Sequence, residues 1–199
     1  MKSVLLVASP ENCALMANGK KTIDVKKSKP KVDTPFKGYI YCTKDKKIKF
    51  WTGKRYSYSD DHSHNLFDRC GNGKVIGEFI CDKIYQYTTM NFKEGVDISD
   101  EDMERMSCLS LEELSRYESG AVNDFCLSYY GLFGWHITEL IIYVQPKALT
   151  QFFKPCKHSF DIDRCGKCKN LSYNDLGIEC CDRRIIRPPQ SWCYVESLR

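Results

Sequence analysis

Three charged side chains lie close together near the start of the chain, and their types permit two kinds of chemistry. Two residues separate Lys21 from Asp24, and one residue separates Asp24 from Lys26. A protonated lysine binds a phosphate or a developing oxyanion, whereas a lysine removed from water has a lowered pKa and can act as a nucleophile or base. The alternative is an exposed charge ladder on one strand, which contributes ~0.2–1 kcal/mol per pair.

Two further residues are candidates for acid–base chemistry. Glu78 stands between apolar residues, so we expect it either to face a cleft as a general acid or base or to pair with a lysine. His136 follows Trp135, and we expect it to stack on a base, to transfer protons near neutral pH, or to be a hydrogen-bonded core residue. The residue types leave these alternatives open.

The chain contains 12 cysteines, and their interpretation depends on the cellular compartment. Residues 1–10 hold a short apolar run and then a helix-start signal, without the cleavage site of a secretion signal, so we expect a cytoplasmic protein. Thiols stay reduced in the cytoplasm, and metal ligation or burial must then account for these cysteines.

A cysteine-rich segment in the last quarter of the chain could bind zinc. Two residues separate Cys165 from Cys168, a spacing typical of zinc sites. The candidate ligands, with His158 in reserve, are four of Cys156, Cys165, Cys168, Cys180 and Cys181. Four thiolates would close the coordination sphere, so such a zinc would be structural and would stabilise a segment with few core residues. The alternative is a set of free thiols in an ordered loop.

Charge is distributed unevenly along the chain. Residues 20–55 contain thirteen Lys or Arg and three Asp, whereas residues 91–119 contain three basic and nine acidic residues. A basic segment with interspersed aromatic residues is typical of proteins that bind a polyanion such as RNA. The alternative is that both segments are solvated surfaces that attract each other.

Local signals predict a helix before Lys21 and a strand after it. Ser9 is a good N-cap, Pro10 fits a first helical turn and Gly19 suits a left-handed stop, so we expect a helix over residues 10–18. Residues 22–26 alternate apolar with polar side chains, which is typical of a strand with one face toward the core.

That alternation would direct Ile23 and Val25 to the core and Thr22, Asp24 and Lys26 to the opposite side. Further strands are expected over 36–43, 48–51, 74–85, 135–144 and 188–195, with the first two paired as a hairpin and 74–85 in a central position. Two acidic helices should begin at Ser99 and Ser110.

Length and composition bound the fold. At 199 residues the chain corresponds to one domain with an appendage rather than to two equal halves. A composition of 42% hydrophobic and 28% charged residues is that of a globular protein and excludes coiled-coil and wholly disordered chains. The longest apolar stretches, such as residues 137–144, are too short to cross a bilayer, so we expect no membrane span.

Residues 19–26 resemble the Gly-x-Lys-x-x-Glu-x-Arg motif of the ASCH family, a branch of the PUA-like β-barrels. Gly19 and Lys21 match the motif, and Asp24 and Lys26 stand at its Glu and Arg positions. Residues 77–79, 130–140 and 187–195 are similar to segments of the longer ASCH-type proteins of bacterial and prophage genomes. The resemblance implies a barrel with a cleft above the motif that takes RNA, a nucleotide or a modified nucleoside. Some relatives are amidohydrolases that act on N4-acetylcytidine, with Lys, Thr and Glu in the catalytic roles.

We therefore predict an α+β fold in which a PUA-like β-barrel with flanking helices carries a Cys-rich C-terminal insertion. The barrel domain would comprise residues 1–154 together with 185–199, and the insertion would comprise residues 155–184 and bind zinc.

Three functional hypotheses follow. The first is binding of RNA or a modified nucleotide in a basic cleft, by Gly19, Lys21, Thr22, Asp24, Lys26, Trp135 and His136. The second is an amidohydrolase that deacylates an N4-acylated cytidine-type nucleoside, with Lys21, Asp24 and Glu78 as catalytic residues. The third is a phage or host interaction protein whose acidic helices bind a partner. An open groove from Lys21 across the lysines of residues 37–55 favours the first, and a closed pocket of about 300 Å³ or more around a desolvated Lys21 favours the second.

Overall fold

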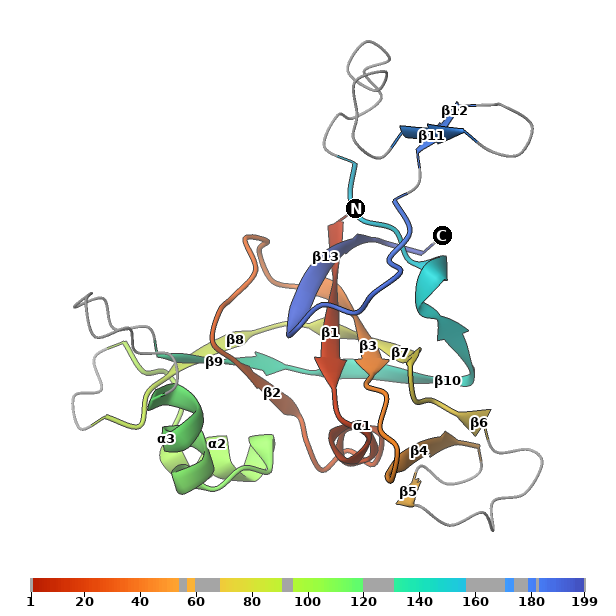
Figure 1. Cartoon of the computed structure of the whole chain (residues 1–199). Helices are drawn as coiled ribbons and strands as arrows, with labels where there is room; N and C mark the ends of the chain where they lie inside the picture. Colours follow the sequence, from red (N-terminus) through yellow and green to blue (C-terminus); the bar gives the residue numbers. More distant parts are fainter. Residues whose placement is uncertain are drawn as a thin grey trace.

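The computed structural model describes residues 2–53, 57–59, 69–90, 95–119, 131–156, 171–173, 179–181 and 183–198. These residues form a mixed α+β structure in which strands predominate and three α-helices accompany the sheets (Figure 1). The predicted α+β class is therefore confirmed. No helix in the described ranges is long and apolar enough to cross a membrane.

The largest sheet has five strands in the order β10-β7-β3-β1-β13. Its strands are β1 (Lys2–Ala8), β3 (Phe36–Cys42), β7 (Lys74–Cys81), β10 (Thr138–Ala148) and β13 (Trp192–Glu196). β1 and β3 run parallel, and every other neighbouring pair is antiparallel. The predicted closing strand is thus β13, at one edge of the sheet, and the predicted strand from residue 74 lies inside the sheet as β7.

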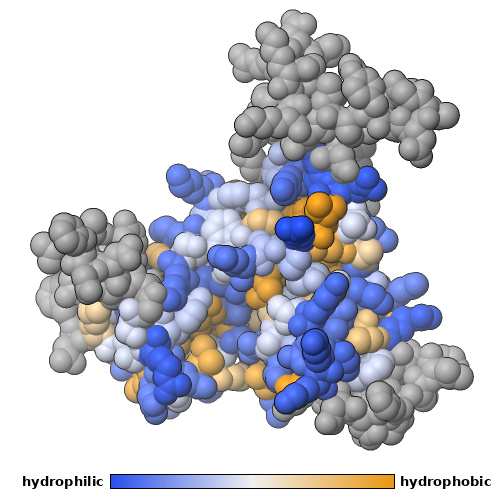
Figure 2. Space-filling view, in the orientation of Figure 1, coloured by the Kyte–Doolittle hydropathy of each residue, from blue (hydrophilic) through white to orange (hydrophobic). Residues whose placement is uncertain are grey.

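We did not expect β1 from the sequence, yet it lies inside the largest sheet. Val4 and Leu6 are buried in the core on one face, and Leu5 is buried on the other face with Tyr39 and Phe152. A strand that is covered on both faces reads as a continuous apolar run and lacks the alternation by which a strand is usually recognised. Figure 2 shows hydrophilic side chains over most of the viewed surface, with smaller apolar areas between them.

Helix α1 (Pro10–Ala17) follows β1 directly and begins as predicted. The side chain of Ser9 caps the helix by accepting a hydrogen bond from the backbone N–H of Asn12 at 3.3 Å. Gly19 then adopts a left-handed conformation with φ of 70°, where a glycine costs least. The helix and its stop are therefore confirmed, and they fix where the chain turns toward β2.

A second sheet has three strands in the order β2-β9-β8. Its strands are β2 (Ile23–Lys26), β8 (Ile84–Tyr87) and β9 (Leu132–His136). Helices α2 (Asp100–Ser107) and α3 (Leu111–Ser119) are the predicted acidic helices, and they share a buried core with this sheet, formed by Ile23, Val25, Tyr87, Met103, Leu114 and Leu132. Ser99 caps α2, and α3 begins with the capping box in which Ser110 and Glu113 bond each other's backbone N–H.

Two segments that we predicted as single strands are each divided between the two sheets. The chain leaves β7 at Cys81 and enters β8 at Ile84, and it changes from β9 to β10 at Ile137. The described strands therefore form separate sheets, with β10 and β13 as the edges of the largest one. The predicted β-barrel is not closed in the described residues, because a closed barrel requires strand pairing around its whole circumference.

Smaller sheets complete the described strands. β4 (Lys49–Thr52) pairs with β5 (Ser57–Ser59) and β6 (Arg69–Cys70), so the predicted hairpin of residues 36–43 with 48–51 is wrong. The side chain of Asn72 accepts a hydrogen bond from the N–H of Phe50 and donates one to the carbonyl of Ile48, which fastens β4 to the turn before β7 instead. Beyond β10 lie a short 3-10 helix, η1 (Leu149–Gln151), and the pair β11 (Leu171–Tyr173) and β12 (Glu179–Cys181).

Candidate functional site

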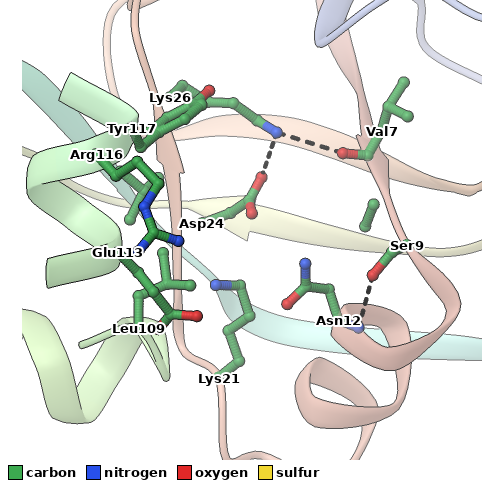
Figure 3. A pocket seen from close by; sticks show the side chains of 12 residues that line it. Val7, Ser9, Asn12, Lys21, Asp24, Lys26, Leu109, Glu113, Arg116 and Tyr117 are labelled. Atoms are coloured by element: carbon green, nitrogen blue, oxygen red, sulfur yellow. Dashed lines mark hydrogen bonds and ion pairs between the residues drawn. The ribbon is translucent and has the colours of Figure 1, made fainter. Parts of the chain in front are cut away.

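A pocket of about 480 Å³ opens where the end of β1, the first turn of α1, β2 and α3 meet (Figure 3). The β1–α1 side of its lining consists of Val7, Ala8, Ser9 and Asn12. The β2 side consists of Lys21, Asp24, Val25 and Lys26. The α3 side consists of Leu109, Glu113, Arg116 and Tyr117. This volume lies within the range of about 300–1,000 Å³ that is usual for small-molecule sites.

The charged residues of the β2 segment are buried, not exposed as a surface charge ladder would be. Lys21 is 2% exposed, Asp24 5% and Lys26 6%. Ile23 and Val25 fill the core beneath α2 and α3, as predicted, so the alternating side chains point to the opposite face of the strand. That opposite face forms part of the pocket rather than part of the solvent-exposed surface, and Figure 3 shows Lys21 and Asp24 directed into one recess.

Asp24 and Lys26 form a buried ion pair at the pocket wall. The Nζ of Lys26 lies 2.8 Å from Oδ2 of Asp24 and also donates a hydrogen bond to the carbonyl of Val7 at 3.3 Å. Oδ2 is buried, and among the described residues no hydrogen bond of favourable geometry reaches it. The ion pair therefore neutralises Asp24 while leaving it capacity to accept a hydrogen bond from a ligand.

Lys21 is fastened to the end of α2. Its Nζ donates a hydrogen bond to the carbonyl of Ser107, the last residue of α2, at 2.5 Å. The carbonyl end of a helix carries a partial negative charge that favours a cation. Burial nevertheless lowers the pKa of Lys21 below its ordinary value, and the negative charge of Asp24 offsets part of this effect.

Helix α3 supplies pocket residues that we did not predict from the sequence. Arg116 and Tyr117 reach the pocket from this helix, and the ammonium of Lys27 lies over the ring of Tyr117 at 4.8 Å from its centre. The guanidinium of Arg116 also pairs with Glu112 at 2.7 Å. The opposite charges of residues 20–55 and 91–119 are the one sequence signal that could have indicated this contact.

The other predicted ligand-binding residues lie outside the pocket lining. Gly19 makes the turn after α1, and the backbone of Thr22 bonds Met106 and Ile137. Trp135 is fully buried and packs edge-on against Phe36. These residues therefore support the segment that carries Lys21, and the lining does not include them.

His136 and Glu78 each have a partner elsewhere. The Nδ1 of His136 lies 2.7 Å from a carboxylate oxygen of Asp82. Glu78 pairs with Lys37 at 2.8 Å and accepts a hydrogen bond from the hydroxyl of Tyr143 at 2.7 Å. Although burial alone would raise the pKa of Glu78, these two hydrogen bonds hold it below its ordinary value. We left open whether Glu78 faces a cleft or pairs with a lysine, and in the structure it pairs with Lys37.

The lysines of residues 37–55 are likewise not part of the lining. The cations of the lining are Lys21 and Lys26 from the β2 segment and Arg116 from α3. An open groove across residues 37–55 is thus not part of the described pocket.

The predicted zinc ligands fall largely outside the described residues. Cys165, Cys168 and His158 lie there, and Cys180 and Cys181 are described only as backbone of β12. Cys156 is a half-buried free thiol. Zinc binding by this segment therefore stays a prediction.

No protein-family model matches the chain, and no curated protein matches it by sequence. Among solved structures, the chain is similar to the ASCH protein of Zymomonas mobilis, with 14% sequence identity and a TM-score of 0.43 over 98% of this chain and 87% of that chain. Two single-substitution variants of the same protein give TM-scores of 0.42 and 0.43 at 14% identity, over 98% of this chain and 91% and 88% of theirs. These structures bear the name of the family whose motif residues 19–26 resemble.

Proposed function

We propose that this chain is an ASCH-type protein that binds RNA or a modified nucleotide through the pocket beside β2. The observation that carries the proposal is the convergence of three buried charged side chains, Lys21, Asp24 and Lys26, in one recess of about 480 Å³. Burying charged groups is costly, and a protein retains them where they are paired or where they recognise a ligand.

The chemistry of the lining suits a nucleotide. Lys21 offers hydrogen-bond donors and Asp24 offers an acceptor, the complementary groups by which a base edge or a phosphate is recognised. Tyr117, at the α3 wall, offers an aromatic ring, on which an unpaired base gains about 1–3 kcal/mol by stacking. The volume admits one nucleotide-sized unit, so an RNA ligand would place a single nucleotide in the pocket.

Deacylation of a modified nucleoside is the second candidate, and two observations favour it: the pocket is larger than about 300 Å³, and Lys21 is buried in its lining. Lys21 is desolvated, and a lysine with a lowered pKa is a better nucleophile or base. However, the hydrogen bond of its Nζ goes to the carbonyl of Ser107 rather than to a carboxylate or hydroxyl, and Glu78 is not in the lining. Incubation of the protein with N4-acetylcytidine, beside the variant K21A, tests this alternative directly.

The test of the binding proposal is a pair of matched substitutions. D24N removes the acceptor charge in the pocket without changing the side-chain shape, and D33N makes the same change at an exposed position. We expect D24N to weaken binding of neutral ribonucleosides, whose N–H groups the carboxylate would accept from, by about tenfold or more, measured by calorimetry, whereas D33N binds as the wild type does. Equal affinities of D24N and the wild type would refute a ligand site in this pocket.

A further inference from the structure

Two of the three cations that line the pocket are paired with an acid, and the third, Lys21, is not. Lys26 is paired with Asp24, and Arg116 with Glu112. Lys21 is bonded to a neutral carbonyl, and among the described residues no carboxylate lies within ion-pair distance of its Nζ. The three buried charged groups of the β2 segment, Lys21, Lys26 and Asp24, therefore carry one net positive charge. The remaining acid of the lining, Glu113, is exposed on α3 and accepts a hydrogen bond from the backbone N–H of Ser110, so it offsets this charge only from the solvent side.

A buried cation without an anion is unfavourable, and a ligand can supply the missing charge. The carbonyl of Ser107 satisfies one of the three N–H groups of Lys21 and gives it a partial counter-charge. No second acceptor bonds Nζ among the residues that the structure describes, and Figure 3 shows Nζ directed into the recess with the amide of Asn12 opposite. The neighbouring carboxylate of Asp24 does not supply the anion, because Lys26 already pairs with it.

We infer that the pocket binds the terminal phosphate monoester of a nucleotide, with the ammonium of Lys21 as its direct cationic partner. This inference rests on the proposed function and names the class of ligand. A phosphate monoester carries about −1.5 to −2 charges at pH 7 and three acceptor oxygens, so it complements the unpaired cation better than a neutral nucleoside does.

The burial of Lys21 argues for a chain end or a free mononucleotide rather than for an internal phosphate. Lys21 is 2% exposed, so a group that contacts its Nζ must enter the pocket rather than lie across its mouth, and a terminal group can do so. An internal phosphodiester would have to bring the chain in and out of the same recess. Arg116 and Tyr117, both exposed on α3, would then lie toward the sugar and base.

The experiment compares AMP, adenosine and inorganic phosphate by calorimetry, with the wild type and two matched variants. K21M removes the buried ammonium and keeps the aliphatic length, and K20M makes the same change at the exposed preceding lysine. We expect AMP to bind the wild type and K20M about tenfold or more tightly than adenosine does, and this phosphate advantage to fall below about threefold in K21M. Oligoribonucleotides with a 5′-phosphate or a 5′-hydroxyl then distinguish a chain end from a free mononucleotide.

A second measurement does not depend on a variant. Titration of the wild type with inorganic phosphate should shift the NMR signals of the Lys21 side chain but not those of Lys20. A phosphate advantage that persists in K21M, or one that is absent in the wild type, would overturn the inference while leaving nucleoside binding in the pocket intact. Failure of AMP, adenosine and RNA alike to bind would instead refute the proposed function itself.

Discussion

Removal of the carboxylate of Glu118 should destabilise the fold strongly, because this side chain fastens the last turn of α3 to the segment after β8. Glu118 is 3% exposed. It accepts hydrogen bonds from the hydroxyls of Thr88 and Thr89, each at 2.5 Å, and from the backbone N–H of Thr89 at 2.8 Å. Since α3 forms one wall of the pocket, this contact also positions the site.

The magnitude follows from these three bonds. Hydrogen bonds to a charged acceptor contribute about 1.5–3 kcal/mol each, and the two hydroxyls can turn toward other acceptors, so we expect E118A to lose about 3–5 kcal/mol. E118Q keeps one acceptor oxygen but turns an NH₂ group toward the donors, and we expect a loss of about 1–3 kcal/mol. The matched control is E112Q, at an exposed carboxylate of the same helix with one ion pair, where the loss should be below about 0.5 kcal/mol.

Urea unfolding, followed by circular dichroism, measures these losses as shifts of the midpoint at an unchanged slope. The expected order of destabilisation is E118A, then E118Q, then E112Q. A free energy of unfolding for E118A within about 0.5 kcal/mol of that for E112Q would refute the view that this buried carboxylate holds α3 in place.

Affinity for a phosphate monoester should fall as the pH rises through the lowered pKa of Lys21, because the ammonium is lost, and the affinity of K21M should stay flat over the same range. In the unfolded chain Lys21 has its ordinary, higher pKa, so between the folded and the unfolded pKa the unfolded state binds more protons. The free energy of unfolding of the wild type should therefore rise with pH in this interval, whereas thermal melts of K21M should show no such rise. E78Q should lose about 1 kcal/mol of stability in urea and keep full ligand affinity, whereas a loss of affinity alone would contradict its structural pairing. G77A should destabilise the sheet by at least about 1 kcal/mol, because the added Cβ would lie 2.4 Å from the carbonyl oxygen of Ile141, and a melting temperature equal to that of the wild type would contradict this close approach. If the cysteine-rich segment binds zinc, elemental analysis should find about one zinc per chain, and C165S should lose it.

Features that depend on neighbouring residues were predictable from the sequence. Ser9 and Gly19 mark the two ends of α1, and Ser110 with Glu113 marks the start of α3, because caps are contacts within a few residues. The alternation of Ile23 and Val25 correctly placed one face of β2 in the core. The same alternation correctly placed Asp24 and Lys26 together on the opposite face of β2.

Features that depend on distant contacts were not predictable in the same way. The break at Ile137 lies inside an apolar run, and neither composition nor periodicity marks the point at which a chain changes sheet. The partners of Glu78 come from 41 residues before it and 65 after it, so its pairing could be foreseen only as one of two alternatives. Arg116 and Tyr117 reach the pocket because α3 packs against β2, and no local sequence pattern at residues 116–117 indicates this packing.

All four residues of β2 are buried, with one face of the strand in the core and the other in the pocket, so the register of β2 is critical. A shift of one position against β9 would bring Asp24 and Lys26 among Met103 and its apolar neighbours and would turn methyl groups into the recess. The first change would lower the stability of the fold, because charged groups would lose their hydration, and the second would remove the groups that recognise the ligand. Insertion or deletion of a single residue at positions 20–22 should therefore abolish folding and ligand capture together, whereas substitutions there would affect them separately.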